Sequence, residues 1–335
     1  MDVEAALAFM IALDCANHLS GGIPAILVNI PGSGGAAATC IDGYQMTKNG
    51  QAQQALVVSF VASVAGGLIT SLAVLALLPF LARLGLVLRS VEMVVIILFG
   101  LTLIAVLAAK DMLKGLIGGA FGLMLGAIGT DQVFSTPRAT FGFLELYDGL
   151  PLVPVLIGLF AISEALVMIE ERVTGNAAPR APQRPQWLET VDGLRMAARH
   201  WWQIVWTAFI GLVIGVIPGA GAYIASFVAY QQSRLFSRTP HLYGTGHPPG
   251  VIAPESANNG VTSGTLVPTM AIGVPGGSTS AVMMIVLQYQ GIVLGPRLFL
   301  EQPSIAYGVF VMMTVAYLFM VALILPLARY AAKVV

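Results

Sequence analysis

The chain has 335 residues, of which 57% are hydrophobic and 10% are charged, and its formal net charge is zero. A soluble domain carries about 25% charged residues to solvate its surface. The composition therefore excludes an ordinary soluble protein, and the neutral charge gives no electrostatic basis for binding nucleic acid. Apolar runs of about 18 residues or more predict helices rather than the alternating strands of a β-barrel. We predict an all-α integral membrane protein, a polytopic helical bundle.

The predicted elements begin with a moderately apolar helix over residues 3–19, which is followed by the stretch "VNIPGSGGAAATCIDG" at 28–43. Further apolar runs predict spans, of which the third is short and rich in glycine; they cover residues 54–84, 92–109, 114–129 and 151–168. Two cysteines, Cys15 and Cys40, have no metal-ligand spacing with histidine, so we expect them to be packing residues.

The segment 170–200 is polar and Pro-rich and contains five arginines, which predicts a cytoplasmic loop by the positive-inside rule. After it, the apolar run 201–230 is broken at "GVIPGAGAYIASF". A polar, turn-rich stretch continues to residue 264, a second broken apolar region follows, and 305–325 is the last predicted span. The sequence thus predicts an N-terminal half at 1–169, a cytoplasmic linker at 170–200 and a C-terminal half at 201–335.

The two halves share a motif. Placing residues 26–40 beside 270–284 aligns Pro31-Gly32 with Pro275-Gly276, with apolar residues before both and Gly, Ser, Thr or Ala after both. Upstream, a looser alignment pairs Asn17 with Asn259. Paired Gly/Pro-interrupted apolar segments in two halves indicate the binding site of a secondary transporter. We therefore predict two repeat-related halves, inverted or parallel, with broken or re-entrant helices at the Pro-Gly motifs.

Such breaks have a physical use. Inside a bilayer, non-helical backbone persists only where protein shields it or where it lines a water-filled cavity. Pro31 and Pro275 stop a helix, and the residues after each can restart one whose first N–H groups are free and whose dipole is positive. Two such helix starts facing each other would attract an anion. No Lys or Arg lies in either motif, so a carboxylate bound there would rest on neutral donors.

Three other interpretations fit parts of the sequence. "GSGGAA" at 32–37 resembles a dinucleotide loop, but Pro31 precedes it and a span rather than a βαβ unit follows. The motifs could instead be helix-packing devices. An intramembrane enzyme would use Glu164, Asp131 or His18, but no acid–base or nucleophile pair has recognisable spacing, so we expect no enzyme. Glu164 could also pair with Arg138 near an interface.

Several longer motifs resemble the large membrane subunit of tripartite tricarboxylate transporters. They are "GGIPAILVNIPGSGGAAATCIDGYQMTKNGQAQQAL" (21–56), "GLFAISEAL" (158–166), "IGVIPGAGAYIASFVAY" (214–230), "GVIAPESANNGVTSGTLVPTMAIGVPG" (250–276) and "GIVLGPRLF" (291–299). The resemblance is collinear over nearly the whole chain.

The resemblance implies a multi-pass protein of the bacterial inner membrane that takes up di- or tricarboxylates by ion-gradient coupling, without a cofactor and with Na⁺ or H⁺ as the coupling ion. It implies a small four-helix membrane subunit and a periplasmic solute-binding protein as partners. The substrate-facing candidates that it implies are Asn29, Pro31, Gly32, Ser33, Gly34, Thr39, Asp42, Pro218, Gly219, Gly221, Asn258, Asn259, Pro275, Gly276, Ser278 and Thr279.

The family's members are longer and begin with a span and a first "LPG" loop, the counterpart of residues 216–219. The resemblance therefore predicts a fragment or shortened member, and a truncated, non-transporting remnant stays open as an alternative.

Overall fold

The computed structural model describes residues 3–84, 112–131, 136–150, 186–217, 220–273, 275–292, 294–295 and 298–331. Its α-helices are α1 (Val3–Ser20), α2 (Gly22–Val28), α3 (Thr39–Lys48), α4 (Ala52–Leu84), α6 (Met112–Gly126), α9 (Gln186–Arg199), α10 (Trp201–Gly215), α11 (Gly221–Phe236), α12 (Pro248–Ile272), α13 (Ser278–Tyr289), α14 (Leu298–Glu301) and α15 (Pro303–Ala331). Short 3₁₀ turns are η1 (Gly34–Ala36), η2 (Leu144–Leu146) and η4 (Pro240–Leu242). The prediction of an all-α membrane protein is confirmed.

Three helical stretches of the described residues are long and apolar enough to cross a membrane: Glu4–Val28, Ala52–Leu78 and Pro303–Ile324. They correspond to the predicted helix at 3–19, extended through α2, and to the predicted spans at 54–84 and 305–325. The predicted spans at 92–109 and 151–168, with Glu164, lie outside the described residues.

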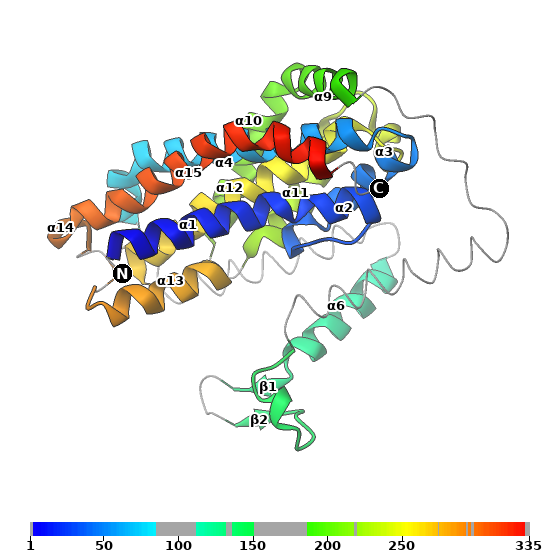
Figure 1. Cartoon of the computed structure of the whole chain (residues 1–335). Helices are drawn as coiled ribbons and strands as arrows, with labels where there is room; N and C mark the ends of the chain where they lie inside the picture. The colour runs from blue at the N-terminus through cyan, green and yellow to red at the C-terminus, as the bar shows by residue number, and fades with distance from the viewer. Residues whose placement is uncertain are drawn as a thin grey trace.

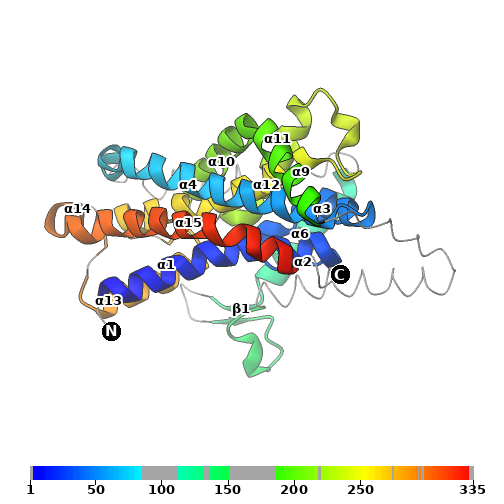
Figure 2. The ribbon, with the colours of Figure 1, turned by 45° about the horizontal axis from the view of Figure 1, so that its top comes forward.

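The bundle is organised around α12. This helix packs against α1, α3, α4, α10 and α11, and in Figures 1 and 2 it runs through the middle of the long helices. Its residues from Pro249 to Ala271 are all buried. The sequence interpretation of 241–264 as a turn-rich stretch is therefore wrong from residue 248 onward. Small polar side chains favour close helix packing and bond to the preceding turn, as Ser256 does to Ile252 O and Thr262 to Asn259 O.

Two further parts differ from expectation. The end of the predicted 170–200 linker is the regular helix α9, which packs on α4. The predicted span at 114–129 is helical only as far as Gly126, where α6 ends. Beyond it, β1 (Gly129–Thr130) pairs with β2 (Pro137–Arg138) in a two-stranded antiparallel hairpin. The hairpin and α6 lie away from the bundle in Figure 1.

Glycines set the crossing of α10 and α12. A methyl group at Gly264 would lie 2.8 Å from Gly215 Cα, and one at Gly215 would lie 2.7 Å from Val261 O. Both neighbours are backbone atoms, which no change of side-chain rotamer can move. Small residues that let two backbones approach closely are the usual basis of helix pairing in a membrane.

The mutation Gly264→Ala is expected to lower stability by about 1–3 kcal/mol, because the two helices must separate. The readout is the thermal unfolding midpoint of the purified protein in detergent. Gly122→Ala is the matched control, since a methyl group there meets nothing within 4 Å. This control should be neutral or stabilising by up to about 1 kcal/mol, because alanine is the better helix former. Equal midpoints for the two variants would show that the crossing is not tightly packed.

Candidate substrate site

The first Pro-Gly motif is a true interruption of the helix. α2 ends at Val28, and Asn29 adopts the left-handed conformation with φ 57°. The Pro24 carbonyl accepts the Asn29 N–H and, at 3.2 Å, the Ile30 N–H. The chain then restarts as η1, followed by α3 from Thr39. Neither η1 nor α3 has a side-chain cap at its start, so their first N–H groups lack the usual partner.

The break is enclosed by α11 and α12. η1 packs against both helices. A methyl group at Gly35 would collide with Asn258 Oδ1 and would lie 2.9 Å from Ala222 Cβ. Ala222 is in the first turn of α11, directly after the second "IPG" sequence at 217–219. Gly35, Ala222 and Asn258 therefore mark the point where two interrupted segments, far apart in the sequence, meet on the central helix.

Two polar atoms at this point have no hydrogen-bond partner among the residues that the structure describes. Asn258 Nδ2 donates to His18 O at 3.0 Å, while Asn258 Oδ1 is buried and unpaired. Ser33 Oγ, next to Gly21, is likewise buried and unpaired. Buried polar atoms are normally satisfied, so exceptions are candidates for contacts with a ligand or ordered water. We refer to Ser33, Gly34, Gly35, Ala222 and Asn258 as the break site.

The Pro-Gly motif of the second half has the same local geometry. α12 ends at Ile272, and the next residue, Gly273, is left-handed with φ 71° and donates to the Pro268 carbonyl, as Asn29 does to Pro24. A methyl group at Gly276 would lie 2.6 Å from Thr265 Cα, and one at Gly32 would lie 2.9 Å from Gly21 Cα. These equivalences follow the Pro31/Pro275 alignment without a gap. The upstream pairing of Asn17 with Asn259 does not keep the sequence offset of the Pro31/Pro275 alignment. In addition, Asn17 is exposed whereas Asn259 is buried.

The two Pro-Gly motifs do not share one contact point. Gly276 packs on Thr265, which lies about two turns, or roughly 10 Å, beyond Asn258 on the same face of α12. Gly276 is thus placed along the face that holds the break site, while α13 begins at Ser278 and includes Thr279 in its first turn. The first motif instead contacts the start of α11, where Gly221 has a φ of 66°. Pro218 and Gly219 lie outside the described residues.

Asp42 has a different environment from the other candidates. Its Oδ1 accepts the backbone N–H groups of Gly244, Gly246 and His247 at 2.8–2.9 Å, and its Oδ2 accepts the Tyr230 hydroxyl at 2.9 Å. Burial lowers the pKa of His247, and the neighbouring Asp42 carboxylate opposes that shift. With Oδ1 bonded to the loop between α11 and α12 and Oδ2 bonded to α11 itself, Asp42 fits an anchor of that loop, and we leave it out of the break site.

Two more candidates contact the protein interior. Thr39 Oγ1 donates to Glu255 Oε1 at 2.6 Å. Asn259 Nδ2 donates to Glu255 O at 3.2 Å, and its Oδ1 accepts the Tyr317 hydroxyl at 3.4 Å. Asn259 therefore faces α15 rather than the break site. Pro31 is buried and Gly32 is exposed, and the Gly32 N–H donates to Gly21 O at 3.1 Å across the turn.

No arrangement of side chains among the described residues supports the enzyme interpretation. Arg138 pairs with Asp131 at 2.5 Å beside the hairpin. The predicted pairing of Glu164 with Arg138 involves a residue outside those that the structure describes. His18 Nδ1 lies 3.0 Å from Asp14 O within its own helix. Within the described residues, no group of three His, Cys, Asp or Glu side chains could hold a metal ion.

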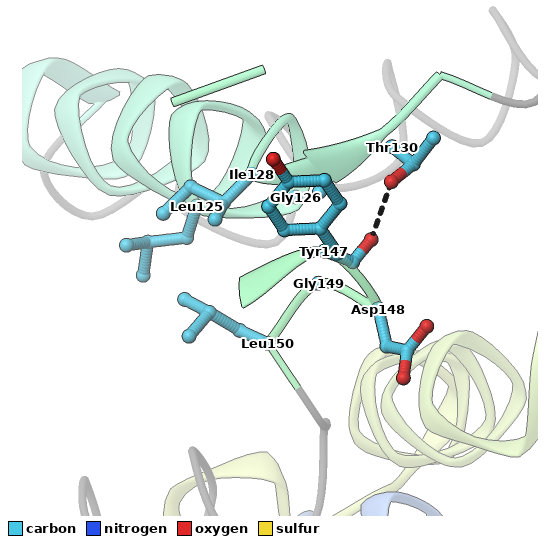
Figure 3. A pocket seen from close by; sticks show the side chains of 9 residues that line it. Leu125, Gly126, Ile128, Thr130, Tyr147, Asp148, Gly149 and Leu150 are labelled. Carbon is cyan, nitrogen blue, oxygen red and sulfur yellow. Dashed lines mark hydrogen bonds between the residues drawn. The ribbon is translucent and has the colours of Figure 1, made fainter. Parts of the chain in front are cut away.

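A cavity of about 610 Å³ lies between α6 and the hairpin, lined by Leu125, Tyr147 and Leu150 among others, and contains none of the predicted site residues (Figure 3).

A family model for the tripartite tricarboxylate transporter TctA family matches residues 1–335. The chain belongs to this family. A relative from Agrobacterium vitis, named as an uncharacterised 52.8 kDa protein in the TAR-I ttuC' 3' region, is 32% identical over 307 residues, which are 92% of this chain and 60% of the relative. A second Agrobacterium vitis protein, from the TAR-II ttuC' 3' region, is 35% identical over 117 residues, 35% of this chain and 48% of that protein.

No solved structure matches the chain. The chain spans 60% of the length of the first of these relatives and 48% of the second. Membership of a transporter family agrees with the expectation of a non-enzyme, and it agrees with a membrane protein that contains several apolar helices.

Proposed function

We propose that this TctA family chain is the membrane-embedded permease subunit of a binding-protein-dependent secondary transporter, driven by an ion gradient, that takes up di- or tricarboxylates. Its proposed location is the bacterial inner membrane, with a small four-helix subunit and a periplasmic solute-binding protein as partners. The proposed organisation is two repeat-related halves joined by the linker at 170–200. The similar geometry of the breaks at Pro31 and Pro275 supports this division.

One observation carries the proposal: two interrupted segments meet at Asn258, in the interior of an apolar bundle, with unpaired polar atoms. The uncapped starts of η1 and α11 supply N–H donors, and α11 adds the positive end of a helix dipole. Such donors favour a carboxylate. Because the motifs contain no Lys or Arg, the site would hold the substrate without a fixed positive charge, and that arrangement permits release.

If the chain is instead a non-transporting remnant, the same geometry leads to a different prediction. It expects no carboxylate binding at the break site, although the helices would still pack. Transport measurements on the complete system separate the two.

The test is uptake of radiolabelled citrate, tartrate and succinate by cells that contain the complete transport system. Removing the unpaired Ser33 hydroxyl with Ser33→Ala is expected to lower uptake at least about tenfold, because a hydrogen bond to a charged group contributes about 1.5–3 kcal/mol. Asn258→Ala removes an unpaired acceptor, to which a substrate hydroxyl can donate, and should lower the uptake of citrate and tartrate. Ser304→Ala, at an exposed residue, is the matched control and should match wild type. Thr279→Ala probes the second motif.

If the Ser33, Asn258 and Thr279 variants all transport at the wild-type rate with equal protein in the membrane, the proposed site is wrong. If the wild-type system accumulates no carboxylate, the remnant interpretation holds instead.

A further inference from the structure

A carboxyl group is buried directly behind the break site. Glu255, in α12, is 0% exposed. Its Oε1 accepts the Thr39 hydroxyl at 2.6 Å, and its Oε2 accepts the Ser63 hydroxyl of α4 at 2.7 Å. A methyl group at Gly22 would lie 2.8 Å from Oε1. Residues from α2, α3 and α4 thus surround this acid on the central helix.

No described residue offers Glu255 a positive charge. α4, from residue 52 to residue 78, and α10 contain no titratable side chain. α3 carries Cys40, Asp42, Tyr44 and Lys48; the 244–247 loop holds Asp42, and Lys48 Nζ lies 4.9 Å from the centroid of the Tyr44 ring. α11 carries Tyr223, Tyr230 and Arg234. α1 carries Glu4, Asp14, Cys15 and His18, of which Asp14 lies 3.5 Å from His18, and Tyr317 of α15 bonds to Asn259. The carboxyl group therefore has hydroxyl partners but no cation among the residues that the structure describes.

An ionised carboxylate in this environment is costly, because burial of an isolated charge is strongly unfavourable. A neutral carboxylic acid fits the contacts better. It can accept the hydrogen bonds of Thr39 and Ser63 and still donate its own proton. Ser59 Oγ is a buried hydroxyl that borders the same space, 3.0 Å from the position of a methyl group at Gly22, and it neighbours the Glu255 carboxyl group. It supplies the acceptor that a protonated Glu255 requires.

The acid is linked to the break site through two short connections. Asn258 lies one turn further along α12, about 4.5 Å by helix rise. Thr39, which bonds to Glu255, is the first residue of α3 and follows η1 in the chain. Any movement of η1 that opens or closes the break site therefore acts on the hydroxyl that bonds to the acid.

From this geometry we infer that Glu255 binds the proton that couples carboxylate transport to the proton gradient, an inference that rests on the proposed function. Glu255 takes a proton from the external water when that side opens. It carries the proton as the neutral acid while buried, as in this structure. It then releases the proton to the internal water, becoming a carboxylate only where water solvates it. The O–H bond is the only bond that forms and breaks.

The test uses proteoliposomes that contain the complete transport system and the carboxylate that the wild type accumulates from a panel of citrate, tartrate and succinate. Two assays are compared: accumulation under an imposed pH gradient and exchange of internal for external substrate without a gradient. Glu255→Gln keeps a neutral side chain that can bond to Thr39 and Ser63 but cannot release a proton. It should still exchange substrate but lose gradient-driven accumulation, by about tenfold per proton at one pH unit.

Glu4→Gln makes the same chemical change at an exposed residue of α1 and serves as the control. Proton-driven accumulation by Glu255→Gln equal to that of Glu4→Gln would overturn the inference. A wild type that responds to a sodium gradient and not to a pH gradient would overturn it as well. These failures are distinct from failure of the proposed function, in which the wild type would neither exchange nor accumulate any carboxylate.

A second variant keeps the inference testable if Glu255→Gln does not fold. Thr39→Val removes one hydroxyl donor but keeps the shape of the side chain. Hydroxyl donors favour the ionised acid, so their loss should make proton release harder. The pH of half-maximal accumulation should then move upward by roughly one unit. An unchanged pH profile in folded Thr39→Val would contradict a role for Glu255.

Discussion

Adding a single methyl group at Gly35 is expected to reduce carboxylate uptake by up to about a hundredfold. The new Cβ would collide with Asn258 Oδ1 and would lie 2.9 Å from Ala222 Cβ. Asn258 would have to rotate out of the break site and give up its bond to His18 O. Overpacking of this kind costs about 1–3 kcal/mol, which corresponds to a factor of up to roughly 100 in substrate affinity. The measurement is initial uptake rate against substrate concentration.

The matched control is Gly118→Ala in α6, where a methyl group meets nothing within 4 Å. A double variant separates a steric effect from a general loss of structure. If the collision with Asn258 is the cause, Gly35→Ala combined with Asn258→Ala should transport no worse than Asn258→Ala alone. Wild-type uptake by Gly35→Ala would mean that this packing does not form part of the substrate site.

Replacing Asp42 by alanine is expected to produce the largest loss of stability. The change leaves the N–H groups of Gly244, Gly246 and His247 and the hydroxyl of Tyr230 without their acceptor. Each unsatisfied buried donor costs about 1–3 kcal/mol, so we expect a total of at least about 3 kcal/mol. Asp42→Asn should cost less, because its Oδ1 can still accept the backbone donors. The thermal unfolding midpoint in detergent provides the measurement.

Asp148→Ala, at an exposed aspartate, controls for loss of a carboxyl group. Transport by Asp42→Asn, normalised to folded protein, separates an anchor from a substrate ligand. An anchor predicts a nearly normal KM, whereas a substrate ligand predicts a large rise in KM. An unfolding midpoint for Asp42→Ala equal to that for Asp148→Ala would contradict the anchor role.

The sequence predicted the apolar helices well, because continuous hydrophobic runs have few alternatives to a spanning helix. α4 and α15 lie where the runs 54–84 and 305–325 place them. The Pro-Gly interruptions were also predictable, since proline and glycine act locally on the backbone. Asn29 and Gly273 each terminate a helix in the left-handed conformation two residues before the proline.

The central helix was not predictable from hydropathy. Residues 248–264 contain prolines, glycines, asparagines and hydroxyl residues, which in isolation are typical of turns. In the bundle their small size allows close contact with α4 and α10, as at Gly260, whose added methyl group would collide with Ala208 O. Tertiary packing outweighs local preference here, and the signal that could have revealed it is the spacing of Gly260 and Gly264.

The composition of the site was predictable, but its pairing was not. Repetition in the sequence links "IPGSGG" with "VPGG", whereas contact in space links it with the start of α11 at "IPGAGA" and with Asn258. Internal symmetry reports common local structure and does not determine which copies touch. The contacts of Glu255 were not predictable for a related reason, because its partners Thr39 and Ser63 are remote in sequence.

The most direct test of the break site is substrate protection of an introduced cysteine. Ala222→Cys places a thiol against Gly35, and Thr279→Cys places one at the second motif; Val282→Cys, on the exposed side of α13, is the control. Labelling by a membrane-permeant maleimide is measured in the complete system, with Cys15 and Cys40 replaced by serine. We predict that a transported carboxylate slows labelling of Ala222→Cys at the concentration that half-saturates uptake, and leaves Val282→Cys unchanged. Protection at Thr279→Cys with none at Ala222→Cys, in variants that still transport, would contradict the proposed site.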